Sequence, residues 1–368
     1  MKVYTCTNCH NPLYFENSQC LNCKHAVGFD PESLTMITLG AVGGDGAAPT
    51  GGGAGAQPYR YCKNAEYGVC NWLIPAGSAA PWCLACTPNR IIPALNSDKN
   101  RDRWKNMEAA KHRLVYSLLR LHLPFSVRRG GQTESIVFNF MADVPAGGKV
   151  MTGHDNGVIT INIDEADEAQ RVRHKLDLGE KYRTLLGHFR HESGHYYWDV
   201  LIKDGPFLEK FRQLFGDESR DYAAALEAYY MQGAPADWNR HFVSQYATAH
   251  PWEDWAETWA HYLHMMDTLE TAWAFGIRID PVELDEDAGI RASIVKEPYG
   301  IREFNRLIKR WLPLCFAVNS LNRSMGHADF YPFILSSAVI EKLQFIHERC
   351  LSLASENAAN PVYKDIPY

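Results

Sequence analysis

The chain has 368 residues, of which 46% are hydrophobic and 22% charged, and its formal net charge is −6. This length exceeds what one small core needs and indicates two or three structural units. An acidic balance argues against nucleic acid or an anionic membrane as a partner. No apolar run reaches the roughly 20 residues that a bilayer span needs, and the N-terminus lacks the apolar core of a secretory signal, so we expect a cytoplasmic protein.

Eight of the ten cysteines lie within the first 86 residues. In a reducing compartment, clustered CxxC pairs are typical of metal ligands rather than of disulfides. Two such pairs lie in residues 1–36, and four thiolates at this spacing predict the tetrahedral zinc site of a zinc ribbon. The predicted ligands of this first site are Cys6, Cys9, Cys20 and Cys23.

A glycine- and alanine-rich stretch, residues 37–57, has little to bury and predicts a flexible linker. Residues 58–97 form a second cysteine unit, whose first pair is more widely spaced than CxxC but which still predicts a second zinc-ribbon-like site. Its predicted ligands are Cys62, Cys70, Cys83 and Cys86. Basic residues near both units are too few for a nucleic-acid surface, so we expect them to be structural or to bind a protein partner.

The remaining residues, 98–368, predict one larger domain that is mostly helical with a small sheet, an α+β layout. Strands are expected at 135–141 and 158–163. The second of these is our candidate for an edge strand that binds extended substrate by strand addition. Helices are expected at 101–123, 180–203, 206–215, 218–231, 238–248, 252–275, 300–316 and 334–352.

The string His191-Glu192-Ser193-Gly194-His195 has the HExxH spacing. On a helix it places the two histidines one turn apart on one face, where both imidazoles can bind one zinc ion. Glu192 then lies beside the metal and can take a proton from water. Gly194 is a small residue at which a neighbouring element could approach closely. The string therefore predicts a catalytic zinc site.

A catalytic zinc needs three protein ligands and an open position. The segment 250–264 is expected to be a helix that begins near Pro251 and carries polar residues along one side. Glu257, in mid-helix, is the favoured third ligand, and Glu253 is the alternative. Asp254 or His261 would then orient a ligand by hydrogen bonding. Four tyrosines are candidate oxyanion donors: Tyr196, Tyr197, Tyr262 and Tyr331.

The segments HFRHESGHYYWD and HPWEDWAETWAHYLH, with the N-terminal cysteine pairs, resemble a bacterial family of zinc-binding metallopeptidases with an N-terminal zinc ribbon. The resemblance covers nearly the whole chain and implies a zincin-like, gluzincin-type domain that binds zinc. The segment AETWA is also similar to the Ala-Glu-x-aromatic-Ala segment of the Mlc titration factor peptidases and of the anthrax lethal factor catalytic domain. The glutamate there binds zinc, which implies Glu257 here. The Glu-x-x-Ala-Asp pattern of other gluzincins would instead align Glu253.

These observations together predict a zinc-dependent peptidase that acts on peptides or proteins, with one catalytic and up to two structural Zn²⁺ ions. The alternative is a zinc-stabilised adaptor or regulatory protein with little catalytic activity. Glu192 argues for the enzyme, because a purely structural zinc needs no general base.

Overall fold

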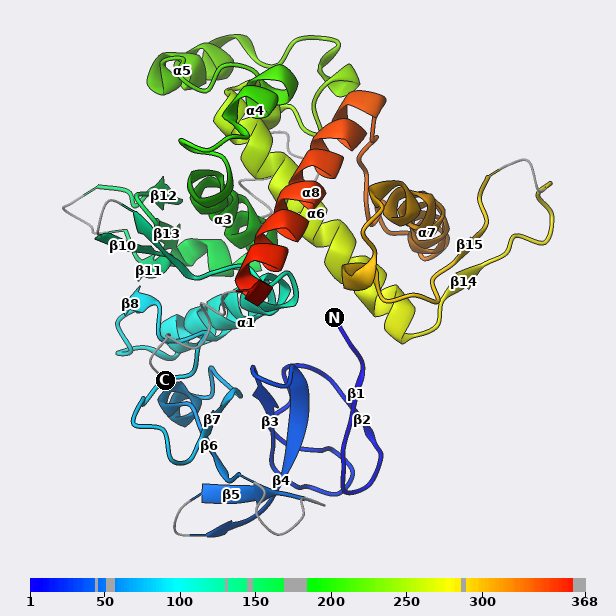
Figure 1. Ribbon diagram of the computed structural model, residues 1–368. Coiled ribbons are helices and arrows are strands. Elements are labelled where there is room, and N and C mark those ends of the chain that lie inside the picture. The colour runs from blue at the N-terminus through cyan, green and yellow to red at the C-terminus, as the bar shows by residue number, and fades with distance from the viewer. Residues whose placement is uncertain are drawn as a thin grey trace. The chain divides into compact units, whose positions relative to one another are not determined.

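The computed structural model describes residues 1–43, 46–50, 57–129, 132–143, 148–168, 184–285 and 289–359. They fall into two compact units (Figure 1). The first holds the described residues of Met1–Arg120 and Pro124–Asp177, and the second those of Leu121–Leu123 and Leu178–Ala359. Several small sheets and long helices confirm the α+β prediction. None of the described helices combines the length and apolar character that crossing a bilayer requires.

Both cysteine units contribute to one five-stranded sheet in the first unit, with strand order β3-β4-β5-β6-β7. A two-stranded ribbon, β1 (Tyr4–Thr5) with β2 (Pro12–Leu13), accompanies it. The strands of the sheet are β3 (Val27–Asp30), β4 (Thr35–Gly43), β5 (Gly46–Pro49), β6 (Tyr59–Tyr61) and β7 (Leu73–Pro75).

The described part of the expected linker, residues 37–57, is not a flexible connection but supplies most of β4 and all of β5. Small residues suit these strands because the backbones approach closely: a Cβ on Gly40 would lie 3.3 Å from the carbonyl oxygen of Ala48. The glycine- and alanine-rich composition predicted a linker, because composition alone does not reveal that two backbones pack closely against each other. Residues 44–45 and 51–56 of the expected linker lie outside the described residues.

The first unit also contains helix α1 (Asp98–Arg120) and a sheet of order β12-β13-β11-β8. The strands are β8 (Asn89–Ile91), β11 (Val137–Met141), β12 (Gly153–Asp155) and β13 (Val158–Asn162), and a separate hairpin joins β9 (Ser126–Arg129) to β10 (Gln132–Ser135). Helix α1 and this sheet lie in the same compact unit as the cysteine units. The boundary expected at residue 98 stays a prediction.

The prediction that residues 158–163 form an edge strand is wrong. β13 pairs with β11 in parallel on one side and with β12 in antiparallel on the other. Asn156 and Gly157 both have positive φ, 46° and 82°, and close a two-residue hairpin that adds β12 at the edge. The alternative interpretation of residues 153–157, a hairpin turn that leads into the strand, agrees with the structure.

The second unit is helical, apart from the short hairpin of β14 (Arg278–Ile279) with β15 (Ala292–Ser293). Its helices are α3 (Leu185–Leu201), α4 (Leu208–Phe215), α5 (Tyr222–Gln232), α6 (Pro251–Ala274), α7 (Phe304–Ser324) and α8 (Ser337–Ala359). The helix expected at 238–248 is replaced by two 3₁₀ turns, Trp238–Arg240 and Tyr246–Thr248. Residues 180–183, the expected start of α3, lie outside the described residues.

Helices α3 and α6 pack tightly against each other at Gly194. A Cβ at this glycine would lie 2.9 Å from Cα of Ala256 and 3.2 Å from Cβ of Trp259. The indole N–H groups of Trp255 and Trp259 reach back to α3, donating to the carbonyl oxygen of Gly194 at 2.9 Å and to Oγ of Ser193 at 3.1 Å. The expected close approach at Gly194 is confirmed. It fixes the register of the two helices.

Replacing Gly194 by Ala should therefore destabilise the protein by about 1–3 kcal/mol, because the methyl group overpacks a backbone contact. In an uncrowded helix the same change would stabilise by up to about 1 kcal/mol. Urea unfolding measures the difference. Gly77→Ala is the control, since a Cβ there meets nothing within 4 Å. An unchanged or raised midpoint for Gly194→Ala would contradict the close contact.

Candidate metal centres

The N-terminal ends of α3 and α6 are both defined by side-chain caps. Oγ of Thr184 accepts a hydrogen bond from the backbone N–H of Gly187 at 3.0 Å, where α3 begins. At the start of α6, Nδ1 of His250 accepts from the backbone N–H of Trp252 at 3.1 Å, and Pro251 takes the first helical position. These caps place His191 in the second turn of α3, His195 one turn further along, and Glu253 in the first turn of α6.

His191 and His195 lie one turn apart and both direct Nε2 towards the carboxylate of Glu253. Nε2 of His191 lies 2.9 Å from Oε2 of Glu253, and Nε2 of His195 lies 3.6 Å from Oε1. Glu253 is 1% exposed, and its Oε2 has no hydrogen-bond partner among the described residues. The ligand atoms of His191, His195 and Glu253 all lie within 4.8 Å of one another, and a buried carboxylate beside two imidazoles fits the ligand set of one metal ion.

Glu257 lies one turn further along α6, on the other side of the His191 ring. Its Oε1 is 2.7 Å from Nδ1 of His191, and its Oε2 accepts a hydrogen bond from Oγ of Ser244 at 2.6 Å. A carboxylate on Nδ1 favours the tautomer in which Nδ1 carries the proton and Nε2 keeps its lone pair for a metal. The structure thus groups the histidines with Glu253, the alternative in our prediction, rather than with the favoured Glu257.

The charges in this group act on one another at short range. Burial lowers the pKa of His191, but the carboxylates of Glu253 and Glu257 outweigh it and hold that pKa well above its usual value. Burial raises the pKa of Glu192, and the neighbouring His191 and His195 offset this only in part. A carboxylate with a raised pKa is better suited to taking up a proton from water.

Asp254 and His261 were predicted to orient a metal ligand, but in the structure each forms a different interaction. Oδ2 of Asp254 accepts a hydrogen bond from Nζ of Lys342 at 2.6 Å, and Nδ1 of His261 is 2.8 Å from the hydroxyl of Tyr331. Ser244, whose hydroxyl donates to Glu257, has the orienting position. It could not be recognised from sequence because it lies in an irregular segment between two 3₁₀ turns.

The four tyrosines considered as oxyanion donors are all buried: Tyr196, Tyr197, Tyr262 and Tyr331. A different residue, Tyr222 on α5, donates its hydroxyl to Oε1 of Glu253 at 2.5 Å. Burial and the charge of Glu253 raise the pKa of Tyr222 above its usual value, so the phenol keeps its proton. A tyrosine in the first turn of a short helix gives no signal in sequence that distinguishes it from a packing residue.

The Asp254–Lys342 pair anchors the first turn of α6 to α8. Both side chains are buried, and Nζ of Lys342 also donates to the carbonyl oxygen of His241 at 2.7 Å. Lys342→Met should lower the free energy of unfolding by about 3–5 kcal/mol, because it leaves a buried carboxylate without its partner. Urea unfolding measures this. Arg323→Met removes the exposed pair with Asp329 and should change little, so equal effects of the two substitutions would contradict the buried pair.

The cysteines form the two predicted groups of four: Cys6, Cys9, Cys20 and Cys23, and Cys62, Cys70, Cys83 and Cys86. All ten cysteines of the chain are free thiols. In the first group the Cys6–Cys23 and Cys9–Cys20 sulfur distances are both 3.6 Å, and in the second the Cys70–Cys83 distance is 3.8 Å. Tetrahedral zinc with Zn–S bonds of about 2.3 Å requires sulfur atoms roughly 3.8 Å apart, so both groups fit the ion.

An α+β chain with two Cys₄ groups and a helix-borne His-Glu-His arrangement belongs to the class of zinc-binding proteins. Residues 100–349 match the model of a family described as "Putative zinc-binding metallo-peptidase", and residues 3–97 match a zinc-ribbon domain. The chain belongs to this metallopeptidase family. Uncharacterized proteins of Mycobacterium tuberculosis and Mycobacterium bovis are 39% identical over 348 residues, which cover 94% of this chain and 94% of theirs. No solved structure matches the chain significantly.

Proposed function

We propose that the protein is a zinc-dependent peptidase whose catalytic ion is held by His191, His195 and Glu253. The observation that carries the proposal is the grouping of the two imidazoles with the buried carboxylate of Glu253, whose ligand atoms all lie within 4.8 Å of one another. Two imidazoles and one carboxylate form an established catalytic ligand set that leaves a position open. Membership of the metallopeptidase family supports the same assignment.

In this proposal each remaining residue of the centre has a separate role. Zinc, when bound, polarises the substrate carbonyl and lowers the pKa of water. Glu192 takes a proton from the attacking water and gives it to the leaving amine. Glu257, held by Ser244, orients His191. The phenol of Tyr222 is the nearest described hydroxyl donor to the carboxylate of Glu253 and is available to stabilise an oxyanion.

The proposed substrates are peptides or proteins, in keeping with the family. We further propose three zinc ions per chain, one catalytic and one in each cysteine group. The ten free thiols favour a reducing compartment, and we propose the cytoplasm. A protein partner that binds through the cysteine units remains part of the proposal, whereas nucleic acid is disfavoured by the charge of the chain.

Glu192→Gln tests the catalytic role. The amide keeps the size of the side chain but cannot take up a proton, so hydrolysis of a mixed peptide library should fall by about 10²- to 10⁴-fold. Metal content, measured on the same preparations, should remain at the wild-type value. Equal hydrolysis by both proteins would overturn the peptidase proposal, and the adaptor alternative would then be preferred.

Glu253→Gln and Glu257→Gln form a matched pair that tests the ligand assignment. The first substitution removes a proposed ligand, so one equivalent of zinc per chain should be lost on gel filtration. The second should keep the ion and weaken its retention against a chelator by about 10- to 100-fold, because only the orientation of His191 is relaxed. Loss of the ion from Glu257→Gln alone would reassign the ligand to Glu257.

A further inference from the structure

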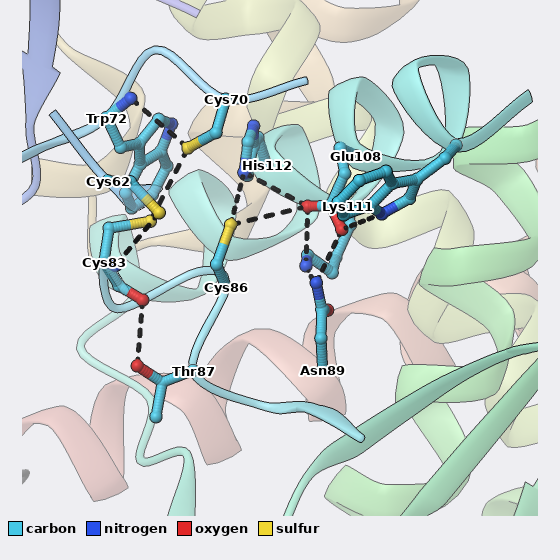
Figure 2. A network of polar contacts seen from close by, with 11 residues as sticks. Cys62, Cys70, Trp72, Cys83, Cys86, Thr87, Asn89, Glu108, Lys111 and His112 are labelled. Carbon is cyan, nitrogen blue, oxygen red and sulfur yellow. Dashed lines mark hydrogen bonds and ion pairs between the residues drawn. The ribbon is translucent and has the colours of Figure 1, made fainter. Parts of the chain in front are cut away.

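The second cysteine group borders helix α1, which lies outside the residues that match the zinc-ribbon model (Figure 2). Sγ of Cys86 lies 3.7 Å from Nε2 of His112 and 3.7 Å from Oε2 of Glu108. Glu108 and His112 are one turn apart on α1, and both are buried. One face of α1 therefore contacts a predicted metal ligand directly.

Glu108 is already saturated by donors, which argues against its being a metal ligand. Its Oε2 is 2.7 Å from Nζ of Lys111, and its Oε1 accepts hydrogen bonds from Nε1 of Trp104 at 2.9 Å and from Nδ2 of Asn89 at 2.6 Å. Nζ of Lys111 also donates to Oδ1 of Asn89. This leaves Glu108 as the acceptor at the centre of a network that joins α1 to β8 (Figure 2).

The orientation of His112 follows from its neighbours. When Cys86 is a thiolate, the form that binds metal, Nε2 of His112 faces two acceptors, the sulfur of Cys86 and the Oε2 atom of Glu108 at 3.4 Å. Two acceptors at one ring nitrogen favour the tautomer in which this nitrogen carries the proton. His112 is stacked on the indole of Trp72, with ring centroids 5.2 Å apart, and this packing fixes the plane of the ring. His112 is therefore a donor towards Cys86.

Charge explains why such donors are needed. Four thiolates around one divalent ion carry a net charge of about −2, and a buried net charge is costly unless hydrogen bonds and counter-charges offset it. Backbone N–H groups serve two of the sulfurs: that of Trp72 donates to Cys70 at 3.4 Å and that of Cys83 to Cys62 at 3.3 Å. Cys86 receives its donor from α1 instead, and the fully buried Lys111 supplies a positive charge that acts on it.

We propose that α1 forms part of the second metal centre: His112 supports the Cys86 thiolate, Glu108 and Lys111 position His112, and metal binding and α1 docking occur together. The first cysteine group has no comparable support from a helix among the described residues. Its described side-chain donors are Thr38, whose Oγ lies 3.5 Å from Sγ of Cys6, and Asn8, which donates to Cys23. Cys9 and Cys23 are only half-buried. The two centres should therefore differ in how tightly they hold metal.

Cobalt-substituted full-length protein tests the role of His112. His112→Ala should shift the sulfur-to-cobalt charge-transfer bands of the second centre and speed release of its ion to a chelator by about 10- to 100-fold. His112→Gln, which keeps an N–H donor, should restore much of the retention. Thr38→Val is the matched control and should act on the first centre only. An unchanged spectrum and an unchanged release rate in His112→Ala would overturn the proposal. Loss of one equivalent of metal from purified His112→Ala, relative to the wild type, would also overturn it, because His112 would then be a ligand.

Amide hydrogen exchange gives a test that does not depend on the His112 variants. Cys70→Ser removes a ligand of the second group, and exchange across residues 98–120 should become faster because α1 loses its docking site. Cys9→Ser removes a ligand of the first group and should leave exchange in α1 unchanged. Equal protection of α1 in both variants would overturn the coupling between this metal centre and the helix.

Discussion

The contact between α3 and α6 at Gly194 is the constraint on which the candidate active centre depends. Because no side chain separates the two backbones there, His191 and His195 face the first two turns of α6 at side-chain distance. Trp255 and Trp259 are fully buried and donate hydrogen bonds back to α3, so the register cannot slip without breaking polar as well as apolar contacts. A zinc ion with three ligands tolerates little displacement, and this packing supplies the precision that it needs.

The same contact explains why the two candidate carboxylates take different positions around His191. Glu253 and Glu257 lie four residues apart on one face of α6, and both reach His191. Helical periodicity cannot separate them, because it fixes the face of a helix and not its position along the partner helix. The approach of Ala256 to Gly194 sets that position, so Glu253 meets Nε2 and Glu257 meets Nδ1. One carboxylate is thus placed to bind metal and the other to orient its histidine.

Much of the fold and of the site could be predicted from the sequence because the signals were local. The CxxC pairs, the HExxH string and the Pro251 helix start each depend on a few neighbouring residues, and the structure contains all three. The features that the sequence did not predict depend on tertiary contacts. Glycine-rich strands β4 and β5 looked like a linker, and Tyr222 and Ser244 acquire their roles from residues distant in the chain. The Asn156-Gly157 turn is a local signal as well, and it agrees with the hairpin that pairs β12 with β13.

Helix α1 shows how one spacing can serve different kinds of centre. Glu108 and His112 have the same i, i+4 relation as His191 and His195, and each pair faces a metal centre. The two pairs differ in the hydrogen-bond donors that surround them. Lys111, Trp104 and Asn89 saturate Glu108, which turns the α1 pair into support for a thiolate. The imidazoles on α3 instead face the buried carboxylate of Glu253, which has a single described side-chain hydroxyl donor, Tyr222. Residue type and the number of surrounding donors together therefore distinguish the pair proposed to bind metal from the pair proposed to support a ligand.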